Sequence, residues 1–230
     1  MRIVASVVFL SAAIMVISDG AAEQRVQGGQ LQRIGPVSDV AQQPLPRVTL
    51  QCKPEKTGDE LSFSYTVTNE GPGDAYVSDA FHRVDPVTHA ASADRDAIVI
   101  ALQPENYALI LRGVPPRPPY PVTRPILPLM HRLHPGERLD RRLLIPMPVA
   151  ETSPYQPYGN VRDYVLKPIE GVVVAVDWIS ARSEGFVASP AVGAEELFTV
   201  HATNLLRDFQ RLTSRFPTRG LSILQRASKG

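Results

Sequence analysis

Residues 61–69 read Leu-Ser-Phe-Ser-Tyr-Thr-Val-Thr-Asn, an alternation of apolar and polar side chains with a period of two. Successive side chains of a β-strand point to opposite faces of its sheet, so this stretch predicts a strand with one buried face. The residues of that face are Leu61, Phe63, Tyr65 and Val67. The same alternation in Val48, Leu50 and Cys52 predicts a second strand, and residues 53–59 provide a connection between the two.

Further strands are predicted along most of the chain, at residues 75–81, 98–102, 107–111, 139–145, 172–179 and 197–200. Residues 172–176 (VVVAV) are apolar on both faces, which is typical of a central strand that is covered on two sides. Many short strands separated by turn residues, with no helical pattern between them, favour an antiparallel sandwich over a parallel sheet. We therefore expect a mainly all-β fold, with an antiparallel β-sandwich over residues 47–180.

The composition of the 230-residue chain limits the classes of function. The formal net charge is +1, which removes the simplest case for nucleic-acid binding, and 22 prolines argue against a helical bundle. Seven of those prolines fall within residues 114–128. This segment is interpreted as a stiff crossing between the two sheets, and the alternative is a polyproline ligand for an aromatic groove.

The N-terminal residues predict export. Arg2 precedes an uncharged apolar run, and small residues follow near Ala22, so residues 1–22 are interpreted as a signal peptide and residues 23–46 as a disordered tether. A bacterial protein of this kind is periplasmic or secreted, and we expect it to be soluble. Cys52 is the only cysteine, so no intramolecular disulfide forms, and its phase in the strand pattern predicts a buried thiol.

The C-terminal residues 181–230 are expected to form an appendage of strand, helix and strand packed on the sandwich. Apolar residues recur at helical spacing in Leu205, Phe209, Leu212 and Phe216, which predicts a short amphipathic helix followed by a final strand at residues 221–224. Arg207, Arg211 and Arg215 form a second stripe. These arginines are candidates for binding an anionic surface, although solvation, or pairing with the acidic part of the same chain at residues 55–105, is the favoured interpretation.

The sequence contains no nucleophile elbow, phosphate-binding loop or zinc-helix motif, so we expect a protein without catalytic residues or a cofactor. One cluster contains suitable metal ligands. If the strand at residues 75–81 bends into a loop, four side chains could converge on a metal ion. They are Asp79, His82, Asp85 and His89.

Three segments together resemble a known group of domains. Residues 61–69 end in Val-Thr-Asn, Ala75-Tyr76-Val77 follow a turn, and Leu133-His134-Pro135-Gly136-Glu137 precedes a later strand. This order is similar to the early strands of bacterial immunoglobulin-like domains, including proteinase-inhibitor-type and pilus-chaperone-type sandwiches. The resemblance covers residues 48–149 and implies an exported immunoglobulin-like fold. It assigns no functional residue, and no second sandwich domain follows.

Together these patterns lead us to expect a non-catalytic binding or assembly module that acts through a face or an edge of the sandwich. Its partner would be another exported protein, and not a nucleic acid. Two alternatives stay open: a metal-binding protein or metal-dependent enzyme built on the Asp/His cluster, and membrane contact through the basic C-terminal helix.

Overall fold

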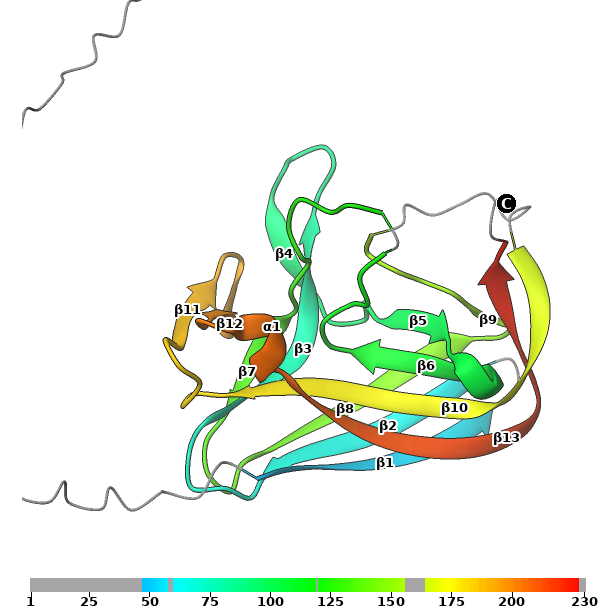
Figure 1. The fold of residues 1–230 in the computed structure, drawn as a ribbon, viewed down its shortest axis with the longest axis horizontal. Coiled ribbons are helices and arrows are strands. Elements are labelled where there is room, and N and C mark those ends of the chain that lie inside the picture. Colours follow the sequence, from blue (N-terminus) through cyan, green and yellow to red (C-terminus); the bar gives the residue numbers. More distant parts are fainter. Residues whose placement is uncertain (1–46, 58–59, 119, 156–163, 228–230) are drawn as a thin grey trace, which may run out of the picture. The chain divides into compact units, whose positions relative to one another are not determined.

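The structure is a computed structural model that describes residues 47–57, 60–118, 120–155 and 164–227. All of these residues belong to one compact unit, Gln43–Gly230. Strands predominate and form two main sheets (Figure 1), so the fold is all-β. The expected signal peptide and tether, residues 1–22 and 23–46, lie outside the described residues.

The smaller sheet has three antiparallel strands in the order β1-β2-β8. Their bounds are β1 (Val48–Thr57), β2 (Glu60–Asn69) and β8 (Arg138–Pro146). The predicted pairing of the first two strands is confirmed, with Leu50 opposite Val67 and Cys52 opposite Tyr65. The alternation of residues 61–69 thus correctly predicts one buried face.

The larger sheet follows the order β11-β12-β7-β3-β10-β13-β9. In addition, β4 pairs with β3, β6 pairs with β10, and β5 pairs with β6. The bounds of its strands are β3 (Ala75–Val84), β4 (Ala91–Asp94), β5 (Val99–Leu102), β6 (Tyr107–Arg112), β7 (Leu129–Leu133), β9 (Val149–Ala150), β10 (Tyr164–Ser180), β11 (Val187–Ala191), β12 (Ala194–His201) and β13 (Gln210–Arg226). A short 3-10 turn, Pro104–Asn106, connects β5 to β6, and these two strands pair antiparallel.

The pairing is mixed, which corrects the expectation of a purely antiparallel fold. β6 runs parallel to β10, and β9 runs parallel to β13. Parallel neighbours require a crossover connection, and the sequence shows no helical crossover between these strands, so their orientation was not visible in the pattern.

β10 is the central strand of the larger sheet. It pairs with β13 along one side (Figure 1) and with β6 and then β3 along the other. The register with β13 shifts at a β-bulge between Ile169 and Gly171, and an added Cβ at Gly171 would clash with the backbone oxygen of Phe216 and the ring of Tyr107. Glycine therefore permits β6, β10 and β13 to meet closely.

The two sheets face each other across a shared apolar core. Phe63, Val67 and Leu143 come from the smaller sheet, while Val174 and Trp178 come from β10, and all are buried in one cluster. The opposite face of β10 is also buried: Val173 and Ala175 lie in a second cluster. This confirms the prediction that the VVVAV stretch is covered on both sides.

The proline-rich segment does not cross between the sheets. It follows β6 and precedes β7, which both belong to the larger sheet, and the expected inter-sheet crossing is therefore wrong. Ile126 of this segment packs against the second cluster, and the backbone N–H of Val114 donates to Asp177 on β10 at 2.8 Å. The segment covers the outer face of the larger sheet.

The predicted C-terminal helix is wrong for most of its length. Only Leu205–Asp208 are helical (α1), and β13 begins at Gln210. Leu212 and Phe216 pack against the inter-sheet core, as alternate residues of a strand do. β11, β12 and β13 are members of the larger sheet, so the strands within residues 181–227 are part of that sheet.

Candidate functional site

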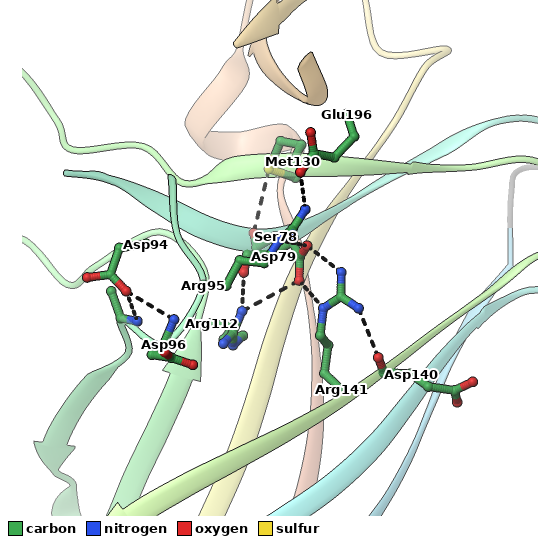
Figure 2. Close-up of polar contacts among 11 residues, drawn as sticks. Ser78, Asp79, Asp94, Arg95, Asp96, Arg112, Met130, Asp140, Arg141 and Glu196 are labelled. Atoms are coloured by element: carbon green, nitrogen blue, oxygen red, sulfur yellow. Dashed lines mark hydrogen bonds and ion pairs between the residues drawn. The ribbon is translucent and has the colours of Figure 1, made fainter. Parts of the chain in front are cut away.

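A buried ion cluster joins the two sheets around Asp79, whose side chain is fully buried. Arg141 binds both carboxylate oxygens of Asp79, with Nε 2.6 Å from Oδ1 and Nη2 2.7 Å from Oδ2. Nη1 of Arg112 lies 3.5 Å from Oδ1 and donates to the Asp79 backbone oxygen, and Nε of Arg95 lies 3.6 Å from Oδ2. Figure 2 shows these arginines converging on the carboxylate.

The strand periodicity explains how these side chains meet. Arg141 lies between the buried Leu139 and Leu143 on β8, so alternation turns its side chain toward the core. Arg112 ends β6 in the same phase as Ile110, which belongs to the inter-sheet core. Neither arginine was predicted from the sequence as part of a site, although each is a charged residue at a position where the strand pattern favours an apolar one.

The electrostatics keep Asp79 ionised. Burial acts to raise the pKa of Asp79, but the hydrogen bonds from Arg141 and the charges of Arg141 and Arg112 outweigh it, so the pKa is lowered. Burial lowers the pKa of nearby His131 and raises the pKa of Tyr65 to about 12. At neutral pH the cluster therefore consists of charged guanidinium groups, one carboxylate, a neutral imidazole and a neutral phenol.

The occupied carboxylate has little capacity for catalysis. A general base needs a free lone pair and a pKa near the working pH, whereas Asp79 is held by arginines and has a lowered pKa. Some buried polar atoms of the described chain lack a hydrogen-bond partner, among them Arg112 Nε, Tyr65 Oη and His131 Nδ1. The cluster is thus a structural connection between the sheets with incompletely satisfied polar groups.

The four residues of the predicted metal site are not brought together. Asp79 is buried among arginines, while His82 near the end of β3 and His89 in the connection between β3 and β4 are exposed. Asp85 forms the turn of that connection: Oδ1 accepts the N–H groups of Val87 (2.9 Å) and Thr88 (2.7 Å), which lowers its pKa. Within the described ranges, no three His, Cys, Asp or Glu side chains are placed to hold a metal ion.

The three arginines of the predicted basic stripe lie in different settings. Arg207 is exposed on α1. Arg211 binds Asp177, with Nε–Oδ1 2.7 Å and Nη2–Oδ2 2.9 Å. Arg215 lies 4.4 Å from the ring centroid of Tyr107 and 3.2 Å from a carboxylate oxygen of Glu105. Two of the three therefore pair with acidic residues of this chain, and one of these partners, Glu105, belongs to the acidic part at residues 55–105.

The connection between β3 and β4 forms a hairpin that projects beyond the rest of the larger sheet (Figure 1). All nine residues from His82 to Ala90 are exposed, and Val84 and Val87 are 58% and 83% exposed. We call residues 82–90 the projecting hairpin. Exposed apolar side chains that lie close together on a surface are candidates for a contact site.

The base of the projecting hairpin is fixed to the neighbouring β11–β12 hairpin. Nη2 of Arg95, just after β4, lies 2.5 Å from Oε1 of Glu196 on β12. Gly193, at φ +75°, approaches the backbone oxygen of Ala91 so closely that a Cβ would clash. Beside it, Val192 is 74% exposed. The two hairpins therefore present exposed valines from a common base.

In the described part of the chain, no helix is long and apolar enough to cross a membrane. No protein-family model matches the sequence, and neither a curated protein nor a solved structure matches it.

Proposed function

We propose that this chain is an exported, non-catalytic binding module with an immunoglobulin-like sandwich, and that the projecting hairpin contacts its protein partner. The observation that carries the proposal is the exposure of Val84 and Val87 on a segment, residues 82–90, in which every residue is exposed. Burying such side chains against a partner yields roughly 25 cal/mol per Å² of apolar surface before the costs of association.

The hairpin is ordered before binding, which favours recognition. Asp85 holds the turn through Val87 and Thr88, and the backbone N–H of Asp85 donates to the Ala90 oxygen at 3.0 Å. A preordered loop loses less conformational entropy when it binds than a flexible one does.

Other features support the immunoglobulin-like and exported parts of the proposal. Two facing sheets share one core, and Asn69, the last residue of the Val-Thr-Asn motif that resembles immunoglobulin-like domains, is buried. Asn69 Nδ2 donates to the backbone oxygens of Gly73 (2.8 Å) and Leu133 (3.0 Å), tying the turn after β2 to β7. The apolar N-terminal run of the sequence supports export.

The test compares two charged substitutions at exposed apolar positions, Val87→Asp on the projecting hairpin and Leu144→Asp on the smaller sheet. Leu144 is 55% exposed, so it is a matched control for adding a charge to an exposed apolar site. Both variants should unfold within about 0.5 kcal/mol of the wild type, because exposed substitutions rarely change stability more. Tagged proteins are used to recover partners from the envelope fraction of the producing cells.

We expect the wild type and Leu144→Asp to recover the same partner and Val87→Asp to lose it. Identical recovery by both variants would place the contact elsewhere and refute the role of the hairpin. Recovery of nothing above background by the wild type, at low and at moderate salt, would refute the binding-module proposal itself.

A further inference from the structure

A cavity of about 360 Å³ lies against the outer face of the larger sheet, between the proline-rich segment, α1 and the start of β13. This volume falls near the lower end of the range of small-molecule pockets, roughly 300–1,000 Å³. We call it the crossing pocket. Its walls include Arg117, Pro125, Tyr155, Leu206, Phe209 and Arg211.

The acidic group in the crossing pocket is already neutralised. Both oxygens of Asp177 accept hydrogen bonds from Arg211, and Oδ2 also accepts the backbone N–H of Val114 at 2.8 Å. The Asp177 side chain is 3% exposed, so this carboxylate neither faces bulk water nor presents a free charge. Nη2 of Arg211 also donates to the Val114 oxygen at 3.3 Å.

The positive charge of Arg117 is uncompensated. Within the described part of the chain, no hydrogen bond or ion pair involves Arg117, and Arg211 uses only Nε and Nη2 for its contacts. Since Asp177 and Arg211 cancel, the pocket carries one net positive charge. Guanidinium groups bind carboxylates with charge-assisted hydrogen bonds.

The remaining walls favour an apolar or aromatic body in the ligand. Phe209 and Tyr155 contribute rings, and the Tyr155 hydroxyl is held in place because it accepts the backbone N–H of Ile126 at 2.8 Å. Pro125 is fixed in φ by its own ring, so it gives the wall a stiff apolar surface. A few charged groups among mostly apolar walls are typical of binding sites for small organic molecules.

From this arrangement we infer that the crossing pocket binds a small organic carboxylate with an apolar or aromatic body, whose carboxylate pairs with Arg117. The inference goes beyond the proposed function, because the pocket is formed by the proline-rich segment, α1 and β13, whereas the projecting hairpin is formed by β3 and β4. Either can fail without the other.

The test measures binding of 4-phenylbutyrate and of its neutral amide to the full chain by isothermal titration calorimetry. The amide keeps the shape and the ring but removes the charge. We expect the carboxylate to bind with a Kd below about 1 mM and the amide to bind at least about ten-fold more weakly. Arg117→Gln should weaken carboxylate binding by about three- to ten-fold and leave amide binding unchanged.

Arg124→Gln is the matched control, since Arg124 is an exposed arginine of the same proline-rich segment that does not line the pocket. It should leave the Kd of the carboxylate unchanged. Leu206→Trp should fill the pocket and abolish binding of both probes, and because Leu206 is 38% exposed the thermal unfolding midpoint should stay near that of the wild type.

Three results would overturn the inference. One is the absence of saturable binding of the carboxylate by the wild type at millimolar concentration. Another is equal weakening by Arg117→Gln and Arg124→Gln, which would indicate a general charge effect. The third is undiminished binding by Leu206→Trp, which would place the ligand outside the crossing pocket.

Discussion

Replacing the buried carboxylate, Asp79→Asn, should strongly destabilise the protein because it leaves cations in the inter-sheet core without a counter-charge. The arginines differ in how well they can respond. Side chains of Arg95 and Arg141 are 44% and 27% exposed and can turn toward water, whereas Arg112 is 3% exposed and cannot. Removing one partner of a buried ion pair costs about 3–5 kcal/mol.

That cost is a large share of the total stability of a domain, about 5–15 kcal/mol. For a domain of this size each kcal/mol shifts the thermal midpoint by about 2–4 °C, so we expect a fall of about 6–20 °C. Urea unfolding measures the free energy directly, provided that the slope m stays constant between variants. Glu105→Gln is the control: its partner Arg215 is exposed, and loss of that pair should cost about 0–1 kcal/mol.

A second substitution separates the unpaired charge from a simple packing defect. Asp79→Asn combined with Arg112→Met should be more stable than Asp79→Asn alone, because the buried cation that lost its partner is gone. A double variant less stable than Asp79→Asn, or a cost of Asp79→Asn below about 1 kcal/mol, would refute the reasoning.

The pH dependence of the stability of Asp79→Asn gives an independent check that the pKa of Asp79 is lowered in the folded protein. The folded pKa of Asp79 is lowered below its unfolded value of about 3.9, so its stabilisation is present above pH 4 and is lost as the pH falls through the folded pKa. Asp79→Asn should therefore lose less additional stability than the wild type does in acid. An equal acid loss in both proteins would contradict the lowered pKa.

The other predictions concern Tyr65, Cys52 and Asn69. The pKa of Tyr65 is raised from 10 to about 12 in the folded state, so the contribution of its neutral phenol to stability should be complete below pH 10 and be lost as the pH rises through 12. The free energy of unfolding should fall by roughly 2–3 kcal/mol over this range. Tyr65→Phe should reduce that loss in alkaline urea titrations, and an unchanged loss would refute the prediction. Burial raises the pKa of the Cys52 thiol to about 11, so an aromatic disulfide reagent at pH 8 should label the folded chain at least about ten-fold more slowly than the urea-unfolded chain, and equal rates would contradict this. Asn69→Ala should cost about 2–4 kcal/mol, since it leaves the Gly73 and Leu133 oxygens and the Gly71 N–H without their side-chain partner; a loss under about 0.5 kcal/mol in urea unfolding would show that water replaces the amide.

The parts of the fold that sequence predicts well are those in which one face of a strand is buried. Residues 61–69 alternate strictly, and residues 139–145 follow the same phase at Leu139, Leu143 and Ile145, which are buried. Both segments are strands of the smaller sheet. Residues 172–176 are apolar on both faces and occupy the centre of the larger sheet. In these segments local pattern and tertiary environment agree, so the pattern is sufficient.

The error in the C-terminal region has a physical cause. Leu212 and Phe216 are four residues apart, a spacing that fits one face of a helix and equally one face of a strand. Residues 210–226 form a strand because they pair with a strand that is distant in sequence. β10 pairs with β13 from Tyr164 opposite Arg226 to Trp178 opposite Gln210. Without β13 the long side of β10 would leave its main-chain groups unpaired, and this tertiary requirement overrides local helical spacing.

The buried ion cluster was predictable only in part. The alternation of residues along β8 places Arg141 on the same side as Leu139 and Leu143. This position identifies Arg141 as an inward-pointing charge that requires a partner. The partner, Asp79, lies 62 residues earlier in the chain, and nothing in local periodicity connects the two. Asp79 was instead grouped with the histidines that follow it, because proximity in sequence is the only proximity that a single sequence shows.

The outer strands of the smaller sheet differ from the projecting hairpin in a way that bears on function. β8 directs Arg141 inward, and β1 carries Lys53 and Pro54; inward charges, lysines and prolines on outer strands are devices that prevent edge-to-edge association. The projecting hairpin lacks such protection at Val84 and Val87, which are exposed yet held in a fixed turn by Asp85. Exposed apolar side chains also occur on the outer strands, where Leu144 of β8 is 55% exposed, so exposure alone does not mark a contact. Val84 and Val87 differ in that every residue of their segment, 82–90, is exposed, and the comparison of Val87→Asp with Leu144→Asp measures whether this difference matters for binding.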